Sequence, residues 1–418
     1  MKTRLVLPIT LGVALALALV GGSTLLWRFF VLAVVVLLPS YLWPRIAIRG
    51  IAGRSGEIPE LGQVGSGFEE EFTLNNHGRL PTPLVEAREA TDLPGYENAA
   101  SFSLASRGQQ TWRTRVHFRR RGRYTLGALD VKMADPLGIF PAGRRLGEPQ
   151  EVLVYPATLE LPHFQALPRL EPGMNRRRWL ASETGPGASR VREYTSGDSL
   201  RHIHWPTTAH TGELMVKEFD PDRASYAFKN IWIVPDMSRG ACLGEGDETT
   251  VEYSITIAAS LAKKYLDGGK YVGMVAAGEP PCLFLPATGE HQLAQMLKAL
   301  ALMKASGEQP IADLLADEAD RFDEGSSLIV IMPSHRPAIT ATLRRIVDRG
   351  GVVGVILLDS ESFGGPADTA GAGADRIARS LGAYGIQAYI VRRGDRLAEA
   401  LDSRHVARRQ HLQGVTAG

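Results

Sequence analysis

The apolar residues of this chain are concentrated near its N-terminus, and this distribution constrains the fold more than any other feature. Between Leu5 and Pro44 the only charged residue is Arg28, whereas charged residues recur throughout the rest of the 418-residue sequence. A helix needs about 20 mainly apolar residues to cross the hydrocarbon core of a bilayer. The sequence therefore predicts a membrane-anchored protein whose larger part is exposed to water.

The apolar segment divides into two runs, residues 5–20 and 25–43, separated by a Gly-Gly-Ser-Thr stretch. Glycine permits the tight turn that joins two antiparallel helices. Residues 1–45 are therefore expected to form a transmembrane hairpin, with Arg28 near its turn, where a long side chain can reach the interface.

Basic residues flank the hairpin on both sides: Lys2, Arg4, Arg45, Arg49 and Arg54. Because cytoplasmic flanks carry an excess of Lys and Arg, the two helices are expected in the cell inner membrane with the soluble domains in the cytoplasm. A cleaved secretory signal is the alternative. A second apolar run follows the first at once, without a clear A-x-A cleavage site, which favours the hairpin.

The charge balance and the cysteine content exclude several classes of protein. There are 47 basic and 45 acidic side chains, so no overall field attracts a polyanion. The basic runs Arg119–Arg123 and Arg176–Arg178 lack aromatic interleaving, so they suit anionic lipid or paired carboxylates and do not predict nucleic-acid binding. Two cysteines, Cys242 and Cys282, exclude a disulfide framework and fit a reducing compartment.

Two folded regions are expected after the hairpin. Residues 46–165 carry short alternating runs such as GFEEEFTLNN, broken by turn residues, which predicts an antiparallel β-sandwich-like domain. Residues 229–402 alternate apolar strands with amphipathic helices, which predicts a Rossmann-type α/β domain with a mostly parallel sheet. Residues 166–228, rich in Pro, Gly and Arg, are expected to connect the two, and residues 403–418 form a polar tail.

Ligands of such α/β sheets bind beyond the carboxyl ends of the strands. The residues expected there are 235–240, 277–281, 333–336 and 359–362.

The connector and the β domain carry a set of short motifs. Those of the connector are Arg192-Glu193-Tyr194, Gly197-Asp198, Leu200-Arg201, Ile203, Trp205, Ala209 and Lys217-Glu218-Phe219. Those of the β domain are Arg121-Gly122-Arg123-Tyr124, the DPLGIF run 135–140 and Val154-Tyr155-Pro156. Together they resemble the "domain of unknown function 58" family. Two positions depart from the family pattern: Pro206 stands where Lys usually follows the Trp, and His210 stands at a usually basic position.

The resemblance implies a membrane-anchored protein with a β-sandwich-like domain and a von Willebrand factor A-like domain. It also implies a partnership with a MoxR-type AAA+ ATPase in the assembly or activation of other proteins. The family has no settled molecular activity, so service to membrane or cell-envelope proteins is an expectation from family context.

The candidate metal site is Asp236 with Ser238, directly after the first strand of the α/β region. In von Willebrand factor A domains a D-x-S-x-S loop at this place supplies oxygen ligands to Mg²⁺. Here Gly240 replaces the second Ser, and Ser334 and Asp359 complete the site only by position. The alternative, which the sequence favours, is that the Asp236 side chain caps the turn after the strand.

The motif residues Arg192, Tyr194, Gly197, Asp198, Arg201 and Trp205 are the candidate interdomain or partner-binding residues. An Arg–Asp pair can hold the connector on a domain, whereas Trp and Arg are typical of docking surfaces. His202 and His204 would share one strand face, but they lack a third metal ligand at a convincing spacing.

No Walker A loop, nucleophile elbow or H-E-x-x-H motif occurs in the sequence. We therefore expect a non-enzymatic membrane-anchored scaffold without a cofactor. The alternative is a divalent-metal-dependent binding or hydrolytic protein that uses Asp236 and Ser238.

Overall fold

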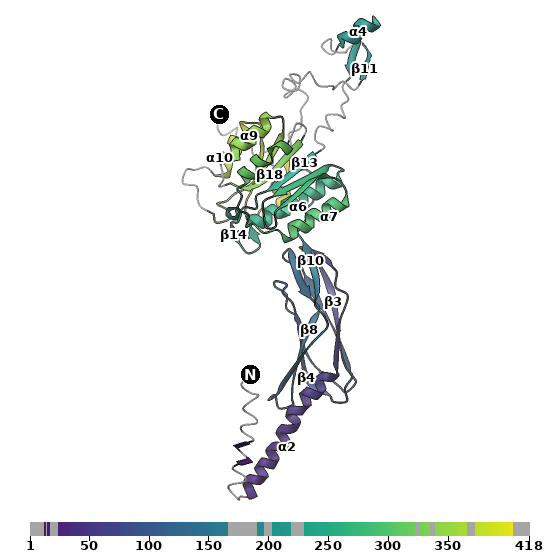
Figure 1. Cartoon of the computed structure of the whole chain (residues 1–418), viewed down its shortest axis with the longest axis vertical. Helices are drawn as coiled ribbons and strands as arrows, with labels where there is room; N and C mark the ends of the chain where they lie inside the picture. The colour runs from purple at the N-terminus through teal and green to yellow at the C-terminus, as the bar shows by residue number, and fades with distance from the viewer. Residues whose placement is uncertain are drawn as a thin grey trace. The chain divides into compact units, whose positions relative to one another are not determined.

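The computed structural model describes residues 12–13, 15–16, 24–165, 190–195, 203–218, 230–322, 326–334, 339–365 and 373–403. The chain forms two compact units, which are considered separately. Residues Met1–Tyr155 form the β unit, and residues Pro156–Gly418 form the α/β unit (Figure 1).

Helix α2 (Thr24–Ala47) is the one helix in the described part of the chain that is long and apolar enough to cross a membrane. It is longer than the predicted run 25–43. Its last turn continues without a break through the 3-10 turn Ile48–Gly50 into the first β-strand. Most of the first predicted span, residues 5–20, lies outside the described residues. The hairpin therefore stays a prediction.

The described part of the β unit contains ten strands. They are β1 (Ile51–Ser55), β2 (Leu61–Gln63), β3 (Gly67–Asn76), β4 (Thr82–Ala90), β5 (Ala99–Leu104), β6 (Gln109–His117), β7 (Gly122–Leu126), β8 (Ala128–Ala134), β9 (Pro141–Leu146) and β10 (Gln150–Tyr155). They form sheets of order β1-β3-β6, β2-β10-β7 and β5-β4-β8-β9, and every pair except the parallel β2–β10 pair is antiparallel. The predicted β-rich region is therefore confirmed.

Alternation along these strands builds the core of the β unit. Phe72 and Leu74 of β3 point inward with Val85 of β4 and Leu129 of β8, and all four are buried. Ala47 at the end of α2 is buried in the same cluster. The helix end is thus part of the core of the β unit.

The α/β unit is built on a six-stranded sheet of order β17-β16-β13-β18-β19-β20, in which only the edge strand β17 is antiparallel. The strands are β13 (Asn230–Pro235), β16 (Tyr271–Ala276), β17 (Cys282–Ala287), β18 (Ser326–Pro333), β19 (Val352–Leu358) and β20 (Gln387–Val391). The helices are α6 (Thr250–Asp267), α7 (Glu290–Leu302), α8 (Ile311–Asp317), α9 (Thr340–Asp348), α10 (Ala374–Gly382) and α11 (Leu397–Ala400). The predicted mostly parallel sheet is confirmed.

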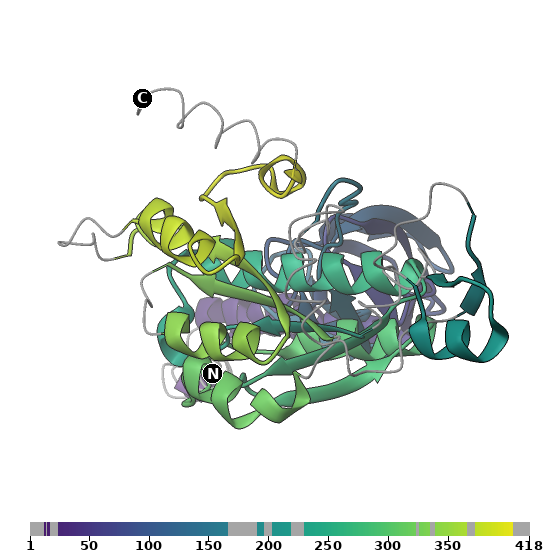
Figure 2. The same cartoon turned by 90° about the horizontal axis from the view of Figure 1, so that it is seen from above.

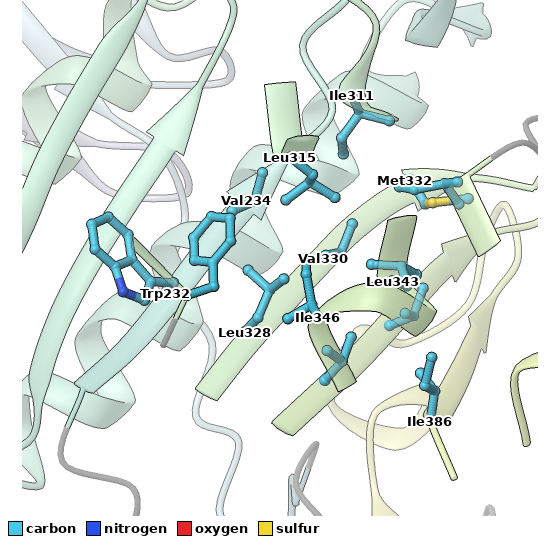
Figure 3. Packing of buried hydrophobic residues seen from close by; sticks show 14 of the residues in the cluster. Trp232, Val234, Ile311, Leu315, Leu328, Val330, Met332, Leu343, Ile346 and Ile386 are labelled. Atoms are coloured by element: carbon cyan, nitrogen blue, oxygen red, sulfur yellow. The ribbon is translucent and has the colours of Figure 1, made fainter. Parts of the chain in front are cut away.

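Helices cover both faces of this sheet, as Figure 2 shows from above. On one face, Trp232 and Val234 of β13 pack with Leu328 and Val330 of β18 against side chains of α8, α9 and α10 (Figure 3). Helix α6 packs on β13, β16 and β18. Coverage on both faces explains why these strands are unbroken apolar runs in the sequence.

The chain divides into its two compact units at Tyr155–Pro156, whereas the sequence predicts that the β domain extends to residue 165. The Leu159 amide donates to Ser260 Oγ of α6 at 2.9 Å, and the Phe164 ring packs on Tyr389 with centroids 5.0 Å apart. Burial of Phe164 against the α/β unit holds this segment there, a long-range contact that no local pattern reveals.

The predicted connector contains a small structure of its own. Strands β11 (Arg190–Glu193) and β12 (Met215–Glu218) pair antiparallel, and helix α4 (Trp205–Thr211) lies between them in the sequence.

Candidate functional site

The direction in which successive strands are added to the sheet reverses between β13 and β18. The chain continues from β13 to β16 on one side, and from β18 to β19 on the other. In open α/β sheets this is where a ligand crevice forms. Asp236 follows β13 directly and Ser334 follows β18 directly, so two predicted loops meet at this crevice.

Asp236 and Ser238 are both buried and are bonded to each other. Asp236 Oδ1 accepts hydrogen bonds from the Ser238 amide at 3.0 Å and from Ser238 Oγ at 2.6 Å. This is an Asx turn, in which a side-chain oxygen organises the backbone two residues ahead. These two hydrogen bonds are the ones expected if the Asp236 side chain caps the turn.

The other two strand-end candidates are also engaged within the chain. Ser334 Oγ lies 3.3 Å from Ser360 Oγ and accepts from the Ser360 amide at 3.1 Å. Asp359 Oδ2 pairs with Arg392 Nε at 3.0 Å, and the Asp359 side chain is mostly buried. Asp359 is therefore neutralised by a cation from the end of the neighbouring strand β20.

Backbone from a distant segment is hydrogen-bonded to the loop that follows β13. The Gly307 amide donates to the Met237 carbonyl at 3.1 Å, and the Arg239 amide donates to the Gly307 carbonyl at 2.8 Å. A Cβ atom on Gly307 would lie 1.5 Å from the Ala277 carbonyl oxygen, so only glycine fits there. The loop after β13 is thus pinned to the chain that follows α7.

The donor set at the crevice is poor for a metal ion. Gly240 offers no side-chain oxygen, and Asp359 is paired with Arg392. Among the residues that the structure describes, no group of three or more His, Cys, Asp or Glu side chains could hold a metal. Asp236 and Ser238 are brought together as predicted, but their hydrogen bonds serve the turn.

The family motif forms a strand pair with a short helix beside it. Ile203 forms a bridge with Val216 of β12, and both side chains are buried. The His204 amide donates to the Met215 carbonyl at 2.7 Å, and the Met215 amide donates to Thr208 Oγ1 at 3.0 Å. These contacts fix the start of α4 on β12.

The arrangement leaves Trp205, the first residue of α4, 65% exposed. The neighbouring His204 Nδ1 lies 2.6 Å from Thr207 Oγ1, which ties this histidine to its own helix. Tyr194 is half-buried, and its amide donates to the Leu214 carbonyl at 2.8 Å. Trp205 is therefore displayed as a large apolar side chain on a locally ordered motif.

The rest of the predicted motif cluster is described only in part. Arg192 lies in β11, opposite Val216, and its side chain is not described. Gly197, Asp198 and Arg201, together with His202, lie outside the described residues. The predicted Arg–Asp clamp therefore stays a prediction.

Sequence reasoning missed a buried acid pair in the β unit. Glu70 of β3 is 1% exposed, and among the described residues neither of its carboxylate oxygens has a hydrogen-bond partner. Burial, reinforced by the nearby Glu89 carboxylate, raises the pKa of Glu70 to about 8. The alternation of GFEEEFTLNN was the available signal, since it puts Glu70 on the same strand face as the buried Phe72.

Glu89, by contrast, is surrounded by donors. Its Oε2 accepts from the Tyr96 hydroxyl at 2.8 Å and from Asn98 Nδ2 at 3.4 Å, while its Oε1 accepts from the Gly127 amide at 2.8 Å. Burial and the Glu89 charge raise the pKa of Tyr96, so this phenol stays protonated and keeps donating. The two acids therefore differ: Glu89 is surrounded by hydrogen-bond donors, whereas Glu70 has none among the described residues and its raised pKa keeps it protonated at neutral pH.

These observations define a two-unit protein in which an apolar helix enters a β unit, and a doubly wound α/β unit is accompanied by an exposed signature motif. Residues 190–371 match the model of the family described as "Protein of unknown function DUF58". This match begins at β11 and extends beyond β19. The predicted resemblance to this family is therefore confirmed over residues 190–371.

The chain is also similar to a bacterial protein. The "Uncharacterized protein YeaD" of Bacillus subtilis (strain 168) is 23% identical over 241 residues, which cover 58% of this chain. The matched region spans only 57% of that protein's length.

Similarity to solved structures is weak. The CARDB domain of the PF1109 protein from Pyrococcus furiosus is 14% identical to the matched part of this chain. The match covers 25% of this chain and 86% of the CARDB chain, with a TM-score of 0.18. The ASH/PapD-like domain of human CEP192 is 20% identical, covers 25% and 84% respectively, and also has a TM-score of 0.18. Scores at this level carry no argument about fold or function.

Proposed function

We propose that this chain is a non-enzymatic, membrane-anchored scaffold that docks a protein partner through its DUF58 segment. The observation that carries the proposal is Trp205, which is 65% exposed at the start of a helix whose backbone is fixed by hydrogen bonds. Tryptophan is among the residues that dominate binding energy when a partner covers it. A folded motif that presents such a side chain suits recognition better than internal support.

The state of the crevice supports a scaffold over an enzyme. Asp236 is bonded to Ser238, Asp359 is paired with Arg392, and Gly307 backbone closes one side. A catalytic site needs polar groups poised toward a substrate, and these groups are directed toward one another. In our proposal the α/β unit is von Willebrand factor A-like, and its D-x-S loop keeps an architectural role.

The proposed partner is a MoxR-type AAA+ ATPase, whose ATP-driven motion would act on a membrane or envelope protein. This part rests on the family resemblance. In the proposed topology α2 and a second helix cross the inner membrane, and both units lie in the cytoplasm, beside anionic lipid. Protease protection in oriented vesicles tests it, since cytoplasmic units are cut only in vesicles that expose that face.

Co-purification tests the docking. Full-length protein in mild detergent, with a slowly hydrolysed ATP analogue, should retain the ATPase, and Trp205→Ala should weaken retention by about 30-fold, the effect of losing a hot spot worth about 2 kcal/mol. Leu285→Ala is the matched control, because Leu285 is 60% exposed on the edge strand β17. If both variants retain the ATPase equally, Trp205 has no docking role. If no ATPase co-purifies with the wild type or with either variant, the proposed partnership is wrong.

The second candidate is a metal-dependent protein, which the juxtaposition of Asp236 and Ser238 favours. Calorimetry with Mg²⁺ and Mn²⁺ distinguishes the two functions. The scaffold proposal expects no heat and no thermal shift, whereas binding that is lost in Asp236→Asn would establish the metal site.

A further inference from the structure

The loop between β8 and β9 presents apolar side chains at its tip. Leu137 is 56% exposed and Ile139 is 44% exposed, and the intervening Gly138 adopts a left-handed conformation with φ of 70°. The tip is the DPLGIF run of the family motif, at residues 135–140.

Asp135 holds this loop in shape from inside. Its Oδ1 accepts from the Phe140 amide at 2.6 Å and its Oδ2 accepts from the Leu137 amide at 3.1 Å. The Gly138 amide closes a turn on the Asp135 carbonyl at 2.9 Å. The buried carboxylate thus satisfies the backbone of the loop, so that a fixed turn carries Leu137 and Ile139 outward.

The same loop lies against α2. The Phe140 ring meets the Tyr41 ring edge-on with centroids 5.6 Å apart, and Ser40 is buried. Figure 1 shows α2 running into one end of the β strands. The loop therefore reaches past the end of the helix, back to Ser40 and Tyr41.

Helix length places this contact at the level of the membrane surface. The stretch Thr24–Pro39, which precedes the contact, spans about 24 Å at about 1.5 Å per residue, whereas the hydrocarbon core is about 30 Å thick. Side chains such as Phe29 and Val35 on this stretch are exposed and apolar, as lipid-facing residues are. If α2 crosses the bilayer from Thr24, about 20 residues span this core, so the far boundary falls near Trp43, within one helical turn of Tyr41 and the loop.

Basic side chains surround the same end of the β unit. The His77 amide donates to the Gly50 carbonyl at 2.8 Å and the Arg107 amide to the Gly78 carbonyl at 3.3 Å, which brings the β3–β4 and β5–β6 turns beside the helix exit. The exposed arginines at this end are Arg49 at the helix exit, Arg79 and Arg107 in the two turns, and Arg144 in β9. The one acid in the β8–β9 loop, Asp135, is buried, so the charge of this end complements anionic headgroups.

We propose that the β8–β9 loop is a lipid-contact site, which inserts Leu137 and Ile139 into the interfacial layer of an anionic bilayer beside the exit of α2. This inference rests on the proposed membrane anchoring through α2. The site gives the β unit a second attachment to the membrane, in addition to helix α2.

Depth-dependent quenching tests it on the full-length protein in vesicles of phosphatidylcholine and phosphatidylglycerol that contain spin-labelled lipid. An environment-sensitive dye is attached to Leu137→Cys, to Val35→Cys as a reference within α2, or to Glu60→Cys as an exposed reference elsewhere on the β unit. Cys242 is replaced by Ala. Cys282 remains unreactive at neutral pH because burial raises the pKa of its thiol to about 12.

The proposal expects a blue-shifted, lipid-quenched dye at residue 137, an unquenched dye at residue 60, and weaker quenching at 137 in vesicles without phosphatidylglycerol. Quenching at 35 without quenching at 137 would overturn the loop site and leave the anchoring intact; a surface for a protein partner would give this result. No quenching at 35 would overturn the anchoring, and the loop site with it. Because Leu137 is largely exposed, its replacement leaves the core unchanged.

Discussion

Glu70 provides a sharp test of the electrostatics of the β unit. Its pKa is raised from 4.5 to about 8, because the carboxyl is buried and the Glu89 charge lies nearby. Below pH 4.5 the acid is protonated in both the folded and the unfolded chain. As the pH rises toward 8, the unfolded chain loses this proton while the folded β unit keeps it, so the free energy of unfolding falls over this window and levels off above it.

The size of the effect follows from the shift. At about 1.4 kcal/mol per pKa unit, the loss of stability between pH 5 and pH 8 is about 3 to 4 kcal/mol. Glu70→Gln removes the titrating group and should abolish this slope. The variant should therefore gain about 3 to 4 kcal/mol relative to the wild type between pH 5 and pH 8, whatever constant offset the amide introduces.

Methionine oxidation in a urea gradient measures this in the full-length protein. Met133 is 4% exposed in the core of the β unit and reports on its unfolding, whereas Met237 and Met274, both buried in the α/β unit, serve as internal references. Glu71→Gln is the matched control, because Glu71 lies at the surface in an ion pair with Arg113, which is worth about 0 to 1 kcal/mol. A constant separation between the Glu70→Gln and wild-type curves from pH 5 to pH 8 would show that Glu70 is not a neutral buried acid.

Three further results are expected from thermal unfolding. Gly307→Ala should destabilise the α/β unit by more than about 2 kcal/mol, because its Cβ would overlap a carbonyl oxygen. Gly382→Ala, at the last position of α10 with open space around it, should be nearly neutral; equal midpoints would contradict the close approach. Tyr389→Phe should cost about 1 kcal/mol, because it deletes the 2.8 Å bond from the hydroxyl to the Gln165 carbonyl, and an unchanged midpoint would mean that the bond is dispensable. Trp205→Ala should change stability by less than about 0.5 kcal/mol, and a larger loss would assign this side chain to the fold instead of to docking.

The strands of the α/β unit can be predicted from the sequence because a strand that is buried on both faces is an unbroken run of apolar residues. The eight-residue strand β18 is buried throughout, and its sequence SSLIVIMP is such a run. Strand β9 is mostly exposed, so its sequence PAGRRL carries no alternating apolar pattern from which a strand could be predicted. Sequence patterns thus report burial more directly than they report backbone hydrogen bonding.

The candidate site was predictable only in its local part. The Asp236–Ser238 turn joins residues two apart, and its chemistry can be read from D-x-S. The pairing of Asp359 with Arg392 and the contact of Gly307 with Met237 join residues from different elements, and no local pattern specifies such partners. The buried position of Glu70 was visible in the strand alternation, but the residue type conflicts with a core position, and the pattern was interpreted by its apolar members.

The direct passage from α2 into the β unit has a mechanical consequence. Ala47 and Ile48 are buried in the core of the β unit, and β1 begins at Ile51, so no flexible linker separates helix from strand. A transmembrane helix whose apolar length exceeds the local bilayer thickness tilts to compensate. For a chain anchored through α2, a tilt caused by a change in membrane thickness, or a lateral pull on the end of the helix, would be passed directly to the β unit.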